Sequence, residues 1–551
     1  MAWEQNFVRR IHRLVWLVCG ITAVTLAESV QGAAINDSSI AQDGIDAYKL
    51  QQSPYNLTGL KIAIGQVEIG RPPQFGLDKA ANSNQVVSIV RAFFRDQPAK
   101  SNTNLDTHAA QVASVLVGNS KALKGVAPNA KLYSSAAAVP RQGGQVEECL
   151  SAQHLAMQNG GDVRAINFSF GEALQQDPRP NAKLDGNALL TLCIDWSARV
   201  HDVVYVVAGN QGKGGIPIPT DNFNGMNIAF TTRLNGVYAK VDFSNIGDVA
   251  PRILKRNDGV ETNLGGRRGI SLVAPGNKVL VANLEGKQTT SIGTSFAAPH
   301  VTATVALLQE FGDRQLRTHC KRGTGCNLPW GLDARRHEVM KAVMMNSADK
   351  IKDNGNGQFL GMTRTVLEKN NQNWLESDAY KNSKVPLNIQ MGAGQLNAFR
   401  AYQQFSPGEW KPNQPVPTIG WDYGKVAENL AFQDYTLESP LQQGSFVALT
   451  LVWDRLVELN DRNRNGQFDA GEGFINRGLN NLDLYLMHAE DNDVRKSVGS
   501  STSDLDSVEH IFHQIPTTRR YKIRVQFRQK VNQPVQPYAL AWWTVSSSPK
   551  L

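Results

Sequence analysis

The chain has 551 residues, of which 41% are hydrophobic and 19% charged, so it can bury a sizeable core and is not a mostly disordered or fibrous protein. At about 150 residues per domain, this length predicts three to four domains, or fewer if one is a large α/β unit. The formal charge of +8 is mild, and no dense run of Lys and Arg with interleaved aromatic residues occurs, which argues against nucleic-acid binding.

The first 34 residues have the composition of an export signal. Arg9, Arg10 and Arg13 precede an apolar stretch at 14–27, which small residues follow. This stretch has 14 residues, whereas a helix needs about 20 to span a bilayer, so a membrane anchor is disfavoured. We therefore expect a signal peptide at 1–34, a secreted or periplasmic protein, and no stable membrane span after cleavage.

Four cysteines follow the signal: Cys149, Cys193, Cys320 and Cys326. An even number is compatible with disulfides outside the cytosol. Cys320 and Cys326 close a short loop and are the favoured pair. Cys149 and Cys193 are expected either as a second pair or as free buried thiols.

Short runs rich in Val, Ile and Ala alternate with helical patterns between residues 57 and 400. The sequence predicts strands at 61–67, 131–133, 165–170 and 203–208, and helices after Asp106, at 146–158 and at 189–200. This alternation predicts an α/β domain at 57–405, with a mostly parallel sheet flanked by helices on both faces. Residues 35–56 are expected as a short N-terminal segment.

The C-terminal part has a different composition. The segment 406–429 contains Pro407, Pro412, Pro415 and Pro417. This composition predicts a stiff linker. Beyond it, residue alternation predicts strands at 446–453, 482–487, 521–527 and 538–545, with no convincing amphipathic helix. We expect an all-β sandwich domain at 430–551.

A nucleophile is indicated by the segment Gly293-Thr294-Ser295-Phe296-Ala297-Ala298-Pro299-His300, which opens a helix-forming run. A Ser at such a turn lies beside free backbone N–H groups at the positive end of a helix, which suits a reaction that develops an oxyanion. The segment resembles the motif G-T-S-x-A-x-P of the subtilisin-like serine proteases. The resemblance implies a subtilisin-like fold, protein or peptide substrates, and Ser295 as the nucleophile.

The resemblance also implies an upstream His that opens a helix, and His108 stands in this context, directly after Asp106-Thr107. An imidazole that titrates near neutrality is the usual acceptor of a Ser proton. The family usually has Gly and Thr directly after this His, whereas Ala109 and Ala110 follow it here. His300, five residues beyond the nucleophile, is expected to pack rather than to react.

The third residue implied by the resemblance is an acid at the end of the first strand, where this chain has Glu68. The family pattern is D-[ST]-G, and the extra methylene of Glu moves the carboxylate by about 1.5 Å. Glu serves this role in other Ser-His-acid enzymes, because the acid has to orient the imidazole and stabilise its cation. Asp78 and Asp106 remain alternatives, although Asp106 is more simply the N-cap of the His108 helix.

Two further segments fit the resemblance. Asn210 follows the strand 203–208, where the family uses an Asn amide to stabilise the oxyanion. The segment Ser169-Phe170-Gly171 follows a strand whose edge, in the family, pairs with extended substrate. A turn Asn and an ordinary buried strand are the alternatives.

These segments together predict a secreted, monomeric serine endopeptidase with a Ser-His-Glu triad and an Asn oxyanion hole. The altered residues around Glu68 and His108 leave a second possibility open. In that alternative the protein has the protease fold but is catalytically inactive and acts as a binding or scaffold protein.

Residues 461–472 match the EF-hand loop pattern D-x-[DN]-x-[DN]-G-x5-E at all twelve positions. The predicted Ca²⁺ ligands are Asp461, Asn463, Asn465, Gln467 through its carbonyl, Asp469 and Glu472. No helices are expected on either side. We therefore predict a structural calcium site in a loop of the sandwich domain, and no cofactor for catalysis. A polar turn without metal is the alternative.

Overall fold

The computed structural model describes residues 39–138, 144–209, 218–243, 266–321, 325–326 and 329–547. The predicted signal peptide at 1–34 and the predicted oxyanion residue Asn210 lie outside the described residues. Within the described ranges, no helix combines the length and the apolar character that crossing a membrane requires.

A nine-stranded, mostly parallel sheet forms the centre of the N-terminal part. The strands are β1 Ala63–Glu68, β2 Arg91–Phe94, β3 Gln97–Pro98, β4 Lys131–Ala136, β5 Val163–Phe168, β6 Val204–Ala208, β7 Met226–Leu234, β8 Val237–Phe243 and β9 Leu272–Pro275. Their order is β3-β2-β4-β1-β5-β6-β7-β8, with β9 also paired to β7. Only the pairs β2–β3 and β7–β8 are antiparallel. This confirms the predicted α/β class.

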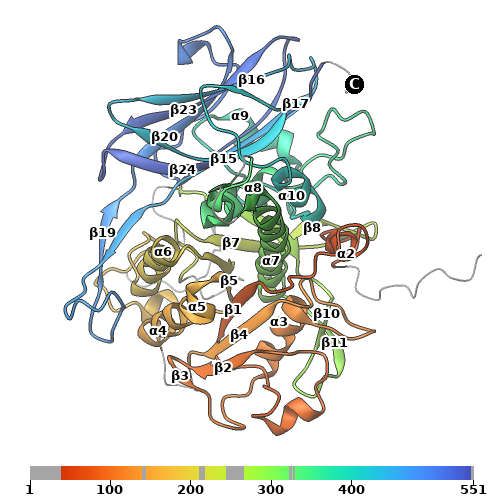
Figure 1. Cartoon of the computed structure of the whole chain (residues 1–551), viewed down its shortest axis with the longest axis vertical. Coiled ribbons are helices and arrows are strands. Elements are labelled where there is room, and N and C mark those ends of the chain that lie inside the picture. The colour runs from red at the N-terminus through yellow and green to blue at the C-terminus, as the bar shows by residue number, and fades with distance from the viewer. Residues whose placement is uncertain are drawn as a thin grey trace, which may run out of the picture. The chain divides into compact units, whose positions relative to one another are not determined.

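Helices cover both faces of this sheet (Figure 1). Helices α3 Thr107–Val117 and α7 Thr294–His319 cover one face, and α4 Gln145–Ala156 and α6 Leu189–His201 the other. Along β6, Val204 and Val206 join the core under α7, whereas Tyr205 and Val207 join the core under α4 and α6. This division follows from the two-residue period of a strand and explains why β6 is apolar throughout.

The remaining elements of this part are short. They are α2 Ala47–Gln51, α5 Gln158–Gly161, α8 His337–Asn346, α9 Asp378–Lys381, α10 Ala398–Phe405, β10 Val279–Ala282, β11 Gln288–Ser291, β12 Cys320–Lys321 and β13 Gly325–Cys326. Helix α2, expected to lie in a separate N-terminal segment, belongs to the α/β core. Ile40, Ile45 and Leu50 are fully buried in the cluster that contains α7 and α10. The α/β domain therefore starts before residue 57.

The cysteines form one described disulfide. Cys149 of α4 and Cys193 of α6 are bonded across a sequence separation of 44 residues. This settles the alternative left open for these two residues in favour of a pair. Cys320 and Cys326 lie opposite each other in the antiparallel pair β12–β13, of which only the backbone is described.

The C-terminal part consists of two packed sheets and a hairpin, which confirms the predicted sandwich. The strands are β14 Pro415–Val416, β15 Ile419–Ala427, β16 Phe432–Leu437, β17 Phe446–Val452, β18 Leu456–Leu459, β19 Phe474–Gly478, β20 Asn481–His488, β21 Gly499–Ser501, β22 Val508–Gln514, β23 Tyr521–Gln529 and β24 Val535–Trp543. One sheet has the order β14-β16-β23-β20-β21 and the other β15-β24-β17-β22.

The predicted linker at 406–429 contains two of these strands. β14 starts at Pro415 on the edge of its sheet, a position where a strand tolerates the missing N–H of proline. β15 follows the last proline of the segment and pairs with β24 along its whole length. The prolines therefore mark the approach to the sandwich, which itself begins before residue 430.

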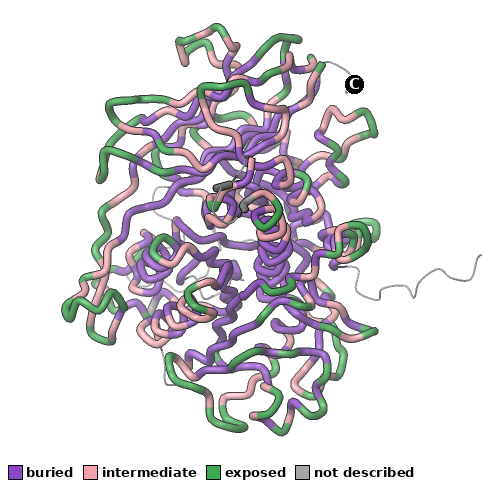
Figure 2. Tube along the Cα trace, viewed as in Figure 1, coloured by how far each residue is buried: buried purple, intermediate pink, exposed green. Residues whose placement is uncertain are grey.

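In the four-stranded sheet, β17 is buried along its whole length and β24 is buried from Tyr538 to Trp543, in the mostly buried region between the two domains in Figure 2. Leu540 and Trp542 of β24 join the core between the two sheets. Ala539 and Ala541 of the same strand join the cluster that contains α8. One face of β24 thus packs in the core of the sandwich, and the other face packs against the α/β domain.

Candidate active site

Glu68 and His108 meet at the end of the central strand. Glu68 is the last residue of β1 and 1% exposed, and His108 is the second residue of α3. Their side chains are in contact, with Glu68 Oε2 at 3.2 Å from His108 Nδ1. Two of the predicted catalytic residues, 40 positions apart in sequence, therefore form a carboxylate–imidazole pair.

The backbone around this pair is held at both ends. Strand β1 is paired on both sides, with β4 and β5. Gln66, two residues before Glu68 on the same face of β1, donates a hydrogen bond from Nε2 to the carbonyl of Ala109 at 2.9 Å. Asp106 caps α3 by accepting the Ala109 N–H at 2.8 Å, as the sequence predicts. Gln66 had no recognisable signal in the sequence, because a buried Gln in a strand fits no motif.

Burial and charge act in opposite directions on this pair. Burial raises the pKa of Glu68, and the His108 charge and hydrogen bond offset only part of that rise. Burial alone would lower the pKa of His108, but the charge and the hydrogen bond of Glu68 outweigh it, so that pKa is raised. The carboxylate thus makes the imidazole a stronger base and stabilises its cation.

Ser295 is the second residue of α7, directly after the turn at Gly293, whose φ is 144°. It is 8% exposed, and its Oγ donates to the carbonyl of Ser169 at 3.0 Å. Among the described residues no hydrogen bond joins Ser295 Oγ to His108. The His108 ring lies 5.6 Å from the ring of Phe296, the neighbour of Ser295. In this structure the Ser295 hydroxyl is therefore directed to Ser169.

The start of α7 is anchored beside the end of β6. Thr294 Oγ1 donates to the carbonyl of Gly209 at 2.6 Å. The dipole of α7 favours negative charge at this point. Asn210 follows Gly209 in the sequence but lies outside the described residues, so its oxyanion role stays a prediction.

The predicted substrate-binding segment lies next to the nucleophile. Ser169 Oγ donates to the carbonyl of Ser295 at 2.8 Å and accepts from Asn167 Nδ2 at 2.8 Å. Phe170 is 5% exposed and stacks on Phe168 at a centroid distance of 5.4 Å. The side chains of Ser169 and Phe170 are thus directed into the protein, and Gly171, which is half-buried, presents only its backbone. This arrangement suits recognition of a peptide through its main chain.

The alternative residues have other partners. Asp78 accepts from Arg71 at 2.6 and 2.9 Å, and Asp106 is the helix cap, so among the described residues only Glu68 pairs with His108. His300 is fully buried, with Nδ1 at 2.7 Å from the carbonyl of Phe296. Burial lowers the pKa of His300 to about 4, so it is neutral and packs, as expected.

The comparison with protein families agrees with this geometry. The model of the subtilase family matches residues 35–363, more than half of the chain. The chain belongs to the subtilase family. The matched range includes Glu68, His108 and Ser295.

Individual relatives are distant. The chain is 27% identical to an alkaline protease from Alkalihalobacillus alcalophilus over 269 residues, which are 48% of this chain and 58% of that protein. It is 26% identical to subtilisin Savinase from Lederbergia lenta over 269 residues, 48% of this chain and 82% of Savinase. The matched region thus spans little more than half the length of the alkaline protease. A solved structure of the prenylagaramide maturation protease PagA covers 65% of this subtilase and 97% of its own chain, at 18% identity and a TM-score of 0.41.

The EF-hand-like loop of this subtilase lies between β18 and β19. Asp461 accepts backbone N–H groups from Arg464 at 2.6 Å and from Gly466 at 2.7 Å, and the φ of Gly466 is 76°. Asn463 and Asn465 each donate from Nδ2 to Asp469 Oδ2 at 2.7 Å. These three side chains therefore converge, and a half-turn of each amide would direct its oxygen to the same region.

Glu472 closes the loop. It accepts the N–H of Arg462 at 2.8 Å and that of Asp469 at 3.1 Å. The donor set of the loop consists of carboxylate, amide and carbonyl oxygens, the last from Gln467, and this is the chemistry that Ca²⁺ requires. The predicted ligand residues therefore fit a calcium ion by chemical type.

The loop contacts the catalytic domain through Phe468. The carbonyl of Phe468 accepts from Gln153 Nε2 of α4 at 3.1 Å, and the Phe468 N–H donates to Gln153 Oε1 at 2.5 Å. The Phe468 ring is fully buried in the core under α4 and α6, stacked on Phe474 at 5.2 Å. Gln153 could not be singled out from the sequence, because 315 residues separate it from Phe468.

Proposed function

We propose that this subtilase is a secreted serine endopeptidase that hydrolyses peptide bonds with Ser295 as nucleophile, His108 as base and Glu68 as the acid that orients His108. The observation that carries the proposal is the buried Glu68 carboxylate at 3.2 Å from His108, beside helix α7, whose second residue is Ser295. Burying a carboxylate is costly unless it is paired. Such a pair next to a Ser at a helix N-terminus is suited to acyl transfer.

In the proposed reaction, Ser295 Oγ leaves the carbonyl of Ser169 and passes its proton to His108 as it attacks the scissile carbonyl. Glu68 accepts the Nδ1 proton of His108 in a hydrogen bond and stabilises the imidazolium. The backbone N–H of Ser295 and the side-chain amide of Asn210 stabilise the tetrahedral oxyanion. His108 then protonates the leaving amine. A water molecule, activated by His108 in the same way, attacks the acyl-enzyme and releases the acid product.

The second candidate is an inactive binding or scaffold protein with the same fold. It is favoured by Ala109 and Ala110 after His108, and by the hydrogen bond that directs Ser295 Oγ toward Ser169 instead of His108. A phosphonate probe for serine hydrolases distinguishes the two. We expect one covalent adduct on Ser295 by intact mass spectrometry at pH 7–9, and loss of both the adduct and casein cleavage in Ser295→Ala. No adduct on folded protein would favour the scaffold.

Secretion is part of the proposal. The apolar stretch at 14–27 behind three arginines supports export. The disulfide between Cys149 and Cys193 suits an oxidising compartment, since disulfides seldom persist in the cytosol. The expected partners are protein or peptide substrates, and the expected assembly is a monomer.

We also propose a structural Ca²⁺ in the loop 461–472, held by the six predicted ligands. Only Asp461, Asp469 and Glu472 contribute carboxylate charge, and two arginines stand between ligands, so the expected dissociation constant is about 10⁻⁵–10⁻³ M. When bound, the ion would neutralise these carboxylates. It would also hold the loop in the shape that presents Phe468 to Gln153 of the catalytic domain. The ion is expected to have no role in peptide hydrolysis.

A further inference from the structure

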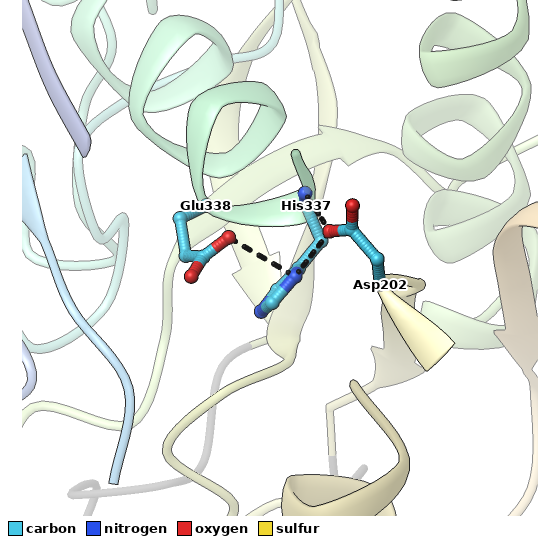
Figure 3. Close-up of side chains that lie close together, drawn as sticks. All are labelled: Asp202, His337 and Glu338. Atoms are coloured by element: carbon cyan, nitrogen blue, oxygen red, sulfur yellow. Dashed lines mark hydrogen bonds and ion pairs between the residues drawn. The ribbon is translucent and has the colours of Figure 1, made fainter. Parts of the chain in front are cut away.

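A buried imidazole lies among three carboxylates where α6, α8 and the sandwich domain meet. His337 is the first residue of α8, Asp202 is the C-cap of α6, and Asp454 follows β17. His337 Nδ1 lies 2.9 Å from Asp202 Oδ1 and 3.1 Å from Glu338 Oε2, as Figure 3 shows. The other ring nitrogen, Nε2, lies 3.0 Å from Asp454 Oδ2.

A hydrogen on Nδ1 has hydrogen-bond geometry toward Asp202 but not toward Glu338. A proton on this nitrogen is donated to Asp202, the nearer acceptor, and Glu338 Oε2 is then left without a hydrogen-bond donor among the described residues. The Glu338 side chain is only 7% exposed. A buried carboxylate oxygen without a donor is unfavourable, and native structures contain few of them. A ligand other than a proton would satisfy all three atoms at once.

We propose that His337 Nδ1, Asp202 Oδ1 and Glu338 Oε2 bind a divalent transition-metal cation, with Zn²⁺ as the reference ion. In a tetrahedral zinc site, bonds of about 2.0–2.1 Å place neighbouring ligand atoms about 3.4 Å apart. The separations of 2.9 and 3.1 Å between Nδ1 and the two oxygens therefore need to widen by only a few tenths of an ångström, and the two oxygens lie within 4.8 Å of each other. The fourth position is left to water, and Asp202, with a side chain 31% exposed, provides the route from solvent.

The groups behind these ligands are those that a metal-binding histidine requires. Asp454 accepts a hydrogen bond from Nε2–H, which selects the tautomer whose lone pair is on Nδ1. The backbone N–H of His337 donates to Asp202 Oδ1 at 2.9 Å. Tyr423 donates its hydroxyl to Glu338 Oε1 at 3.4 Å, on the oxygen that does not face the site. Each ligand is thus oriented by a second contact.

Among the described residues, the cations near these three carboxylates are Arg336 and Lys341. Arg336 approaches Asp202 at the other oxygen, Oδ2, at 3.6 Å. The metal would displace the Nδ1 proton, so its affinity should rise with pH.

The site would join the two domains, because Asp454 belongs to the sandwich and the three ligands to the α/β domain. It is distinct from the calcium loop, whose donors are all oxygens. Its ligands are a nitrogen and two carboxylates, a donor set that favours a transition metal over Ca²⁺. This inference does not depend on the proposed peptidase activity.

The test is a Zn²⁺ titration of the chelator-treated full-length protein by calorimetry, with metal content measured after gel filtration. We expect one equivalent of Zn²⁺ in the unmodified protein and in the calcium-loop variant Asp461→Asn, which serves as the matched control. Glu338→Gln should lose the binding, because the amide keeps the volume but not the charge. Asp454→Asn should weaken it by about 10–100-fold. Replacing Zn²⁺ by Co²⁺ should produce a visible absorption band in the unmodified protein and none in Glu338→Gln.

Thermal melts in chelator keep the result interpretable, since Glu338→Gln must melt as a folded protein to be compared. The inference is overturned if the folded, unmodified protein retains no Zn²⁺. It is equally overturned if Glu338→Gln binds Zn²⁺ as well as the unmodified protein does. Either outcome would identify the cluster as a His337 imidazolium paired with Asp202 and Asp454.

Discussion

Replacing Glu68 by Gln should lower turnover by about 10³–10⁴ with little loss of stability. At 3.2 Å and an effective dielectric constant of about 20, the attraction between the carboxylate and the His108 imidazolium is at most about 5 kcal/mol. Solvent screens part of it, because the His108 side chain is 39% exposed. An amide also favours the wrong imidazole tautomer, which adds to the loss. At 1.36 kcal/mol per tenfold in rate, the two effects give the expected range.

The assay is the rate of peptide hydrolysis as a function of pH, with the rate of phosphonate labelling beside it. Neutral His108 is the active base, and its pKa is raised, so activity of the unmodified enzyme should rise with pH through a value above 6.5. In Glu68→Gln the charge that raises this pKa is gone while burial remains, so this limb should move to lower pH. Folding should persist, because burial already disfavours the charged form of Glu68.

The matched control is Glu68→Asp, which keeps the charge but shortens the side chain by about 1.5 Å. The contact of 3.2 Å would then lengthen to about 4.7 Å unless the backbone moves, so activity should fall while the pH limb stays high. A loss below tenfold in Glu68→Gln would refute the assignment. It would reassign the orienting role to Asp106 or Asp78, both of which have other partners here.

Three further outcomes follow from contacts outside the triad. Reducing the disulfide between Cys149 and Cys193, or replacing both residues by Ser, should lower the free energy of unfolding by about 4 kcal/mol for a loop of this size. An unchanged denaturant midpoint would contradict this prediction. Arg455→Met should lower the free energy of unfolding by about 3–5 kcal/mol, because it leaves Asp195 buried without the guanidinium that pairs with it across the two domains. Urea unfolding measures this loss, and a loss under 1 kcal/mol would argue against the ion pair. Ca²⁺ at one hundred times its dissociation constant should stabilise the full-length chain by about 2.7 kcal/mol, which is measured as a higher melting temperature than in chelator. Asp461→Ala should abolish this difference. Superimposable melts of the unmodified chain with and without Ca²⁺ would refute the site.

Local sequence patterns were sufficient to predict the helices and strands and to identify the residues that lie in motifs. The strand that ends at Glu68 and the helix that begins after Asp106 follow from residue period and capping, which act within a few residues. Ser295 was recognisable because its motif is continuous. The linker prediction was wrong for β15. Proline content reports on the residues that precede a strand, and it does not reveal the strand's pairing partner, which here is β24.

The sequence by itself determined the α/β class and the β-sandwich, and it predicts Ser295 as the nucleophile, because hydrophobic period and continuous motifs are properties of neighbouring residues. Only the tertiary structure decided which side chains meet. Gln153 reaches Phe468 across 315 residues, and His337 reaches Asp454 across 117. These contacts depend on the crossover connections of the sheet and on the packing of the sandwich against α8. A one-dimensional pattern contains no information about them, because each partner is ordinary in its own sequence neighbourhood.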